Sequence, residues 1–204
     1  MIRETEPFDR ILETLRKAAG ALQRAHVPFL LGGGLACWAR GGPETDHDVD
    51  FLVRPEHGEA GLEALEQAGM KTERPPEHWL VKAYDDGVLV DLIFEPSGLR
   101  VDDAMFERAE ELEVYAVRMQ VASLDDVVTT KLMALSEQNL DYRSVLEIAR
   151  TLREQIDWTR VRGRTGGSPY ARAFFTLVEE LGIVDSSYPS RTGSVSRIRG
   201  SRKP

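Results

Sequence analysis

Residues 29–53, FLLGGGLACWARGGPETDHDVDFLV, decide the fold that we predict for this chain of 204 residues. An apolar run comes first, three consecutive glycines follow, and a second apolar run closes the stretch with Asp48 and Asp50 inside it. Residues two apart in a strand point to the same face, so these carboxylates should project together while Val49 and Phe51 point into the core. Neighbouring carboxylates repel each other unless a cation lies between them, and oxygen ligands suit a hard ion such as Mg²⁺. The stretch therefore predicts a metal site on a strand.

Asp91 supplies a third candidate ligand from a later apolar run, residues 88–94, which follows an Asp-Gly pair and another apolar run. An Asp-Gly pair between two such runs is typical of a tight hairpin turn. A lone carboxylate inside an apolar strand is costly to bury unless it is paired, hydrogen-bonded or bound to a metal. A solvent-facing aspartate would explain Asp91 taken alone. The paired aspartates upstream favour a triad of Asp48, Asp50 and Asp91 on neighbouring strands.

The pattern of apolar residues and turn residues predicts an α/β (α+β) fold, with strands and helices mixed to about residue 122 and only helices after it. The expected strands are residues 29–31, 48–53, 79–84, 88–94 and 114–122. The expected helices are residues 6–25, 35–40, 57–69, 123–136, 140–155 and 169–181. We accordingly expect a mixed domain over residues 1–122, a helical subdomain over 123–185 and a disordered basic tail over 186–204.

Composition and charge limit the class of protein. With 42% apolar residues, the chain can form a proper core. Its single cysteine, Cys37, excludes an internal disulfide framework, and nothing near it marks it as an activated nucleophile. The charged start and the lack of a long apolar run predict a cytoplasmic protein with no membrane partner. Residues 1–185 carry 21 basic and 34 acidic side chains, a balance that argues against a general nucleic-acid binder.

Taken together, these motifs resemble the nucleotidyltransferase superfamily that shares the palm of DNA polymerase beta. Its pattern is an apolar strand, a Gly-Gly or Gly-Ser turn that opens a helix, Asp-x-Asp on the next strand, and a third acid on a later strand. The matching residues lie between positions 27 and 95 and are Gly33, Gly34, Asp48, Asp50 and Asp91. The resemblance implies a nucleotidyltransferase palm over residues 1–122. It also implies an enzyme that moves a nucleoside monophosphate from an NTP to an acceptor hydroxyl.

The same resemblance implies how the site would work. Two Mg²⁺ ions held by the three aspartates would clamp the triphosphate, and Asp91 would help to lower the pKa of the acceptor hydroxyl. The backbone N–H groups of Gly32, Gly33 and Gly34, at the start of a helix, would cradle the β- and γ-phosphates. A tight strand-to-helix turn with a positive φ would explain the same glycines without any ligand.

Within the superfamily, residues 30–53 and the helix pair after residue 123 look like the AbiEii and MenT-type toxins and their bacterial relatives. That resemblance assigns Lys131 and Asp141 to assistance at the nucleotide. Thr45, three residues before the first metal aspartate, stands near the family's nucleotide-binding Ser or Thr. A solvated helix lysine and an aspartate in a first helical turn would be equally ordinary. The toxin resemblance also implies RNA, at the 3′ end of tRNA, as acceptor and a cognate antitoxin as partner.

An RNA acceptor would need basic side chains, because phosphate contacts supply most of the affinity. Arginines do concentrate in the helical half, at Arg143, Arg150, Arg153, Arg160, Arg162, Arg164 and Arg172. Two alternatives remain open. One is a nucleotidyltransferase for small molecules of the aminoglycoside or lincosamide kind, whose cationic substrates suit an acidic body. The other is a non-catalytic nucleotide-binding regulatory protein, for which an altered triad would have been the signal.

Overall fold

A mixed sheet forms the centre of the structure, a computed structural model that describes residues 7–45 and 48–185. Its strands are β1 (Phe29–Leu31), β2 (Asp48–Val53), β3 (Lys71–Glu73), β4 (Leu80–Asp85), β5 (Val88–Ile93), β6 (Glu110–Val114) and β7 (Val117–Val121). Their order across the sheet is β3-β4-β5-β2-β1-β7-β6. β2 runs parallel to β5 and antiparallel to β1, while β4 runs antiparallel to β5. The strand that begins with Asp48 is therefore central.

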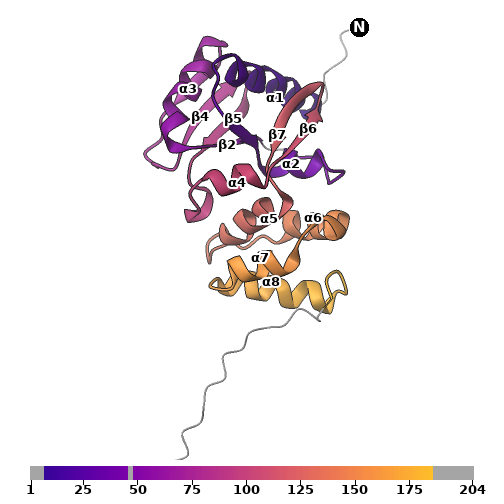
Figure 1. The fold of residues 1–204 in the computed structure, drawn as a ribbon. Coiled ribbons are helices and arrows are strands. Elements are labelled where there is room, and N and C mark those ends of the chain that lie inside the picture. Colours follow the sequence, from indigo (N-terminus) through magenta and orange to yellow (C-terminus); the bar gives the residue numbers. More distant parts are fainter. Residues whose placement is uncertain (1–6, 46–47, 186–204) are drawn as a thin grey trace, which may run out of the picture.

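The helices divide between the sheet and a separate stack. They are α1 (Pro7–Arg24), α2 (Gly33–Trp38), α3 (Gly58–Gln67), α4 (Asp103–Glu107), α5 (Leu124–Met133), α6 (Arg143–Leu152), α7 (Trp158–Thr165) and α8 (Pro169–Glu180). Short 3₁₀ helices occupy η1 (Pro55–His57), η2 (Pro96–Gly98) and η3 (Arg153–Gln155). Figure 1 shows α1 and α3 beside the sheet and α5 to α8 stacked in the other half of the molecule. None of the helices in the described ranges is both long and apolar enough to cross a bilayer.

α1 packs on the sheet because its apolar residues recur at three- and four-residue steps. Ile11, Leu15 and Leu22 are at most 4% exposed, and they belong to the same core as the inward residues of the central strands. Lys17 on the same helix pairs with Asp85 at the end of β4. The helical face of the sheet is thus closed by α1, which leaves the opposite face for the charged residues of β2 and β5.

The predicted α/β fold class is confirmed, and most of the predicted elements are present within a few residues of their expected bounds. A single strand over residues 114–122 was wrong, because the chain folds there into the hairpin of β6 and β7. Tyr115 and Ala116 form its turn, with φ values of 47° and 61°. These residue types rarely adopt a positive φ, so the turn has no Gly or Asn to mark it. The expected basic tail lies outside the described residues.

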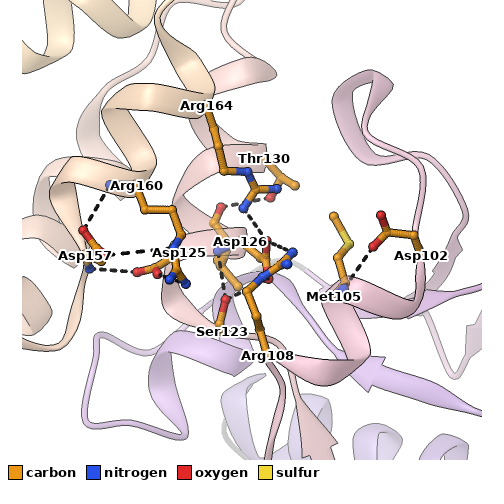
Figure 2. Close-up of polar contacts among 11 residues, drawn as sticks. Asp102, Met105, Arg108, Ser123, Asp125, Asp126, Thr130, Asp157, Arg160 and Arg164 are labelled. Carbon is orange, nitrogen blue, oxygen red and sulfur yellow. Dashed lines mark hydrogen bonds and ion pairs between the residues drawn. The ribbon is translucent and has the colours of Figure 1, made fainter.

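A buried carboxylate at the start of α5 connects the two halves of the molecule (Figure 2). Asp126 is 1% exposed and accepts hydrogen bonds from Arg108 at 2.9 and 3.0 Å. Arg164 of α7 also donates to it, as does the Ser123 hydroxyl at 2.8 Å. Burial works against the charged form, but the hydrogen bonds from the two arginines and Ser123 outweigh it and hold the pKa of Asp126 below its usual value. Asp126 therefore joins the segment after α4 to α5 and α7.

We predict that Asp126→Asn lowers the free energy of unfolding by about 3 kcal/mol, because it leaves two arginines facing a buried neutral group. The loss should stand at the lower end of the range for buried pairs, since the side chains of Arg108 and Arg164 are 29% and 28% exposed and keep some hydration. Urea unfolding would measure it. Glu154→Gln, which removes the exposed partner of Arg153, is the control and should cause no measurable loss. An equal effect of the two substitutions would contradict the assigned role of Asp126.

Candidate active site

Three carboxylates converge on one face of the sheet. Asp48 and Asp50 are the first and third residues of β2, and Asp91 lies on the neighbouring strand β5. The parallel pairing of these strands places Asp50 directly opposite Asp91. One carboxylate oxygen from each of the three lies within 4.8 Å of the other two. The predicted triad is therefore assembled in space from residues 41 positions apart in the chain.

Burial and the charges of neighbouring carboxylates raise the pKa values of Asp50 and Asp91. The pKa of Asp50 is raised to about 7, first by burial and then by the negative charges of Asp48 and Asp91. Burial also raises the pKa of Asp91, against the opposing effect of Lys82, whose Nζ lies 3.2 Å from Asp91 Oδ1. A divalent cation would relieve this repulsion, and carboxylate oxygens are the ligands that Mg²⁺ prefers. The residues present therefore fit the predicted metal.

The glycine turn leaves room for the carboxylates. Gly33 has a φ of +55°, and a Cβ at this position would lie 1.8 Å from Asp50 Oδ2. A Cβ on Gly34 would lie 2.8 Å from the side chain of Thr45. α2 begins at Gly33, and the N–H of Gly32 just before it donates to the backbone carbonyl of Asp50 at 2.8 Å. The glycines thus have a steric role in the site that is separate from the phosphate contact expected of them.

A cleft of about 340 Å³ is lined by α2, α5, α6 and the loop before β2. None of the three carboxylates lines it, and it is linked to them through Gly34, which follows the Gly33 that lies against Asp50. It brings together four of the predicted site residues, which are Gly34, Thr45, Lys131 and Asp141. The positive charge of Lys131 acts on Asp50 and favours its ionised form. Asp141 precedes α6 and accepts a hydrogen bond from the N–H of Arg143 at 2.9 Å. These four residues therefore border one space, whereas Gly32 and Gly33 of the expected nucleotide site do not line it.

Cys37 also lines this cleft, but its sulfur belongs to the core. The residue is 1% exposed, and burial raises the pKa of its thiol to about 11. A thiol that stays protonated at neutral pH is a poor nucleophile. Cys37 is a packing residue, in agreement with the interpretation of its sequence context.

Lys82 is a neighbour of the triad that the family motif does not contain. It lies on β4 directly opposite Asp91, and its ammonium group pairs with that carboxylate. A signal for it exists in the sequence. A two-residue turn at Asp86-Gly87 fixes the hairpin register, so that Asp85 pairs with Val88 and, three steps back, Lys82 pairs with Asp91. The alternation of the strand then places both side chains on the same face.

The arginines of the helical half are largely engaged within the protein. Five of the seven make ion pairs with carboxylates, namely Arg143, Arg153, Arg160, Arg162 and Arg164. Arg160, for example, lies 3.2 Å from Asp125, which also accepts a hydrogen bond from the N–H of Asp157 at 2.8 Å (Figure 2). Residues 123–185 carry 8 basic and 10 acidic side chains. The expected basic surface for RNA is therefore not a property of this half as a whole.

Comparison with protein families identifies the chain. The family model described as a nucleotidyl transferase of unknown function (DUF2204) matches residues 11–169. That match covers most of the 204 residues, so the chain belongs to this family. The prediction of a nucleotidyltransferase enzyme is confirmed. A comparison with curated proteins gives no match.

Solved structures share the fold at low sequence identity. The antibiotic-resistance factor ANT(2″)-Ia in complex with adenylyl-2″-tobramycin gives a TM-score of 0.59 at 13% identity, over 80% of this chain and 98% of that chain. The solution structure of ANT(2″)-Ia gives 0.57 at 14% identity, over 84% and 96%. A structure described as that of a putative nucleotidyltransferase from Thermotoga maritima gives 0.46 at 21% identity, over 76% and 94%. The first two matches support the same nucleotidyltransferase architecture.

We predict that Mg²⁺ or Mn²⁺ raises the melting temperature of the protein through the triad. A ligand at about 100 times its Kd stabilises the folded state by about 2.7 kcal/mol, which calorimetry or dye-based melting would detect. Asp50→Asn should abolish the shift, and without metal it should be at least as stable as the wild type because it removes a half-buried carboxylate that its neighbours repel. Asp103→Asn, at an exposed ion pair with Arg54, is the control and should keep the shift. A full metal shift in Asp50→Asn would exclude the site.

Gly33→Ala should disable metal binding by steric displacement of Asp50. Gly41→Ala is a matched control, because Gly41 also has a positive φ of +87° but nothing within 4 Å of its added Cβ. Both substitutions should cost about 1 kcal/mol in backbone strain. Only Gly33→Ala should lose the metal-dependent rise in melting temperature. Loss of the rise in both variants would mean that backbone conformation, and not contact with Asp50, controls the site.

Proposed function

We propose that this protein is a Mg²⁺-dependent nucleotidyltransferase that moves a nucleoside monophosphate from an NTP to a hydroxyl group of a small cationic molecule. The observation that supports the chemistry is the convergence of Asp48, Asp50 and Asp91, together with Lys131, which lines the cleft and whose positive charge acts on Asp50. Metal held by the three carboxylates would neutralise charge on the triphosphate and favour ionisation of the acceptor hydroxyl.

The cleft residues bind and orient the nucleotide in this proposal. The ammonium group of Lys131 contacts the phosphates, and the hydroxyl of Thr45 and the backbone of Gly34 lie on the same side. The acceptor oxygen forms a bond to the α-phosphorus as the bond from that phosphorus to the bridging oxygen breaks. Pyrophosphate leaves with the bonding electron pair, and the hydroxyl proton passes to the carboxylate of Asp91.

The charge of the protein supports a small cationic acceptor. Residues 1–185 have 34 acidic against 21 basic side chains. Such a surface attracts cations and repels a polyanion. The internal pairing of the helical arginines acts in the same direction, because it leaves fewer of them for phosphate contacts. ANT(2″)-Ia, which has the same fold, was solved with an adenylylated aminoglycoside.

A toxin-type enzyme of the AbiEii and MenT kind, which would add nucleotides to the 3′ end of tRNA, is the second candidate. One observation favours it. Lys131 and Asp141, the two positions that the toxin resemblance assigns to the nucleotide, both line the cleft next to Thr45. A cognate antitoxin would then be expected as a partner. The two candidates share the donor half of the reaction and differ only in the acceptor.

The experiment incubates the protein with Mg²⁺ and each α-labelled NTP, together with tobramycin, lincomycin or total tRNA. Label on a drug would support the small-molecule acceptor, and label on tRNA would replace it with the toxin-type reaction. Transfer to neither, alongside normal NTP binding, would contradict both candidates and favour a nucleotide-binding regulatory protein.

We predict that Asp48→Ala abolishes label transfer and that Asp91→Asn lowers kcat by at least about a hundredfold while NTP binding is largely kept, because general-base contributions are of this size. NTP affinity would be measured by equilibrium dialysis and turnover by release of pyrophosphate. The control is Asp86→Asn, which alters an aspartate in the hairpin turn after β4 and should keep full activity. Activity retained in Asp48→Ala would overturn the assignment of the site.

A further inference from the structure

The three carboxylates lie between two different surfaces. On one side is the cleft of α2, α5 and α6, which contains Gly34 and Lys131. On the other side of Asp91 the sheet continues through β4 to the edge strand β3. The register places Lys82 of β4 beside Asp91, and Glu73 of β3 beside Lys82. A row of charged side chains therefore leads from the triad to the sheet edge.

This side of the sheet is available to a ligand. α1 and α3 pack on the opposite face, where Asp85 pairs with Lys17 and also accepts a hydrogen bond from the hydroxyl of Thr14. On the face of the triad, the Lys82 side chain is 24% exposed, and its neighbour Tyr84 is half-buried. The Tyr84 hydroxyl donates to an exposed carboxylate, that of Glu73, at 3.0 Å. The surface combines an aromatic ring, a carboxylate and an ammonium group.

The in-line geometry of nucleotidyl transfer favours this surface as the place where the acceptor binds. In phosphoryl and nucleotidyl transfer, the attacking oxygen and the leaving oxygen lie roughly in line on opposite sides of the phosphorus. If the leaving pyrophosphate is held in the cleft beside Lys131, the attacking hydroxyl has to come from the far side of the triad. Asp91 is the member of the triad nearest to β4, since β5 separates β2 from β4.

We propose that the acceptor docks on the β3–β4 side of the triad and that Lys82 is a positioning residue for the transfer. Lys82 holds the Asp91 carboxylate toward the entering hydroxyl, and Glu73 with Tyr84 binds an amino group or hydroxyl group elsewhere on the acceptor. This assignment rests on the proposed nucleotidyl transfer and adds to it the acceptor subsite. Lys82 itself exchanges no proton in the reaction.

Two features agree with a positioning role for Lys82. The backbone positions of both partners are fixed, because Lys82 and Asp91 lie directly opposite each other on two antiparallel strands. Their side chains therefore meet on the same face of the sheet. The pair is also largely enclosed, since the side chain of Asp91 is 11% exposed. A carboxylate held in this way has few alternative rotamers, which favours a near-attack geometry.

The test measures acceptor kinetics in Lys82→Met, which keeps the length of the side chain and removes its charge. With the acceptor that the wild type labels among tobramycin, lincomycin and tRNA, we expect kcat/KM for the acceptor to fall about 10- to 100-fold, as a small misplacement of a reacting group does. NTP affinity should stay unchanged, and the metal-dependent rise in melting temperature should be kept or become larger, because the site loses a competing positive charge. Lys82→Arg, which keeps a cation beside Asp91, should recover part of the loss.

Two further variants separate the subsite from a general effect on stability. Lys17→Met removes the matching lysine from the Lys–Asp pair on the other face of β4 and should leave all kinetic constants unchanged. Glu73→Gln should raise the KM for a cationic acceptor about tenfold without changing kcat, because it removes uniform binding.

Three outcomes would overturn the assignment. The first is unchanged acceptor kinetics in Lys82→Met, and the second is a loss of NTP affinity as large as the loss in acceptor kcat/KM, which would move Lys82 to the nucleotide side. The third is failure of the wild type to label any acceptor, which would remove the proposed function together with the subsite. The first two results can be obtained only with an active wild type. They would therefore contradict the acceptor subsite and leave the proposed nucleotidyl transfer standing.

Discussion

Repulsion between the three carboxylates is the constraint on which the site depends. Asp50 and Asp91 can lie side by side only because β2 and β5 pair in parallel, and the hydrogen bonds of a central sheet strand hold them there against their charge. The glycine turn contributes the space that the Asp50 side chain occupies, since any Cβ at Gly33 would collide with Asp50. A divalent cation converts the same crowding from a penalty into a binding site. The strand pairing that brings the three carboxylates together is therefore also what would give the site its affinity for a cation.

The sequence predicted those parts of the fold whose signals are local. The glycine turn, the Asp-x-Asp strand and the Asp86-Gly87 hairpin were all visible because each depends on a few adjacent residues. The hairpin of β6 and β7 was missed because its turn uses Tyr115 and Ala116, which carry no turn signal. Short polar β3 and the small helices α4 and α7 were missed because they are too short to show a clear apolar period, although Asp102 and Asp157 cap the two helices. Local sequence patterns therefore predicted most of the strands, but not the edge strands β3 and β6.

Pairing between distant charges was the main information that the sequence could not supply. A count of arginines predicted a basic helical surface, whereas the structure directs Arg160 and Arg164 toward the buried Asp125 and Asp126. These arginines join α7 to the start of α5 within the helical half, and a guanidinium group engaged by a buried carboxylate is less available to a phosphate. Lys82 is the opposite case, because the predicted hairpin already aligned it with Asp91. The difference is that strand pairing follows a fixed register, while helix packing does not.

Parallel alignment of β2 and β5 has a further consequence for folding. Side chains alternate between the two faces of a strand, so a slip of one residue would turn Asp91 toward the core beneath α1 and α3. A charged carboxylate without a partner there would be far more costly than one beside Lys82. The apolar residues of β5 occur on both sides of Asp91 and discriminate weakly between the two alignments. The residue proposed for catalysis therefore also helps the chain to select the correct strand register, before any substrate is bound.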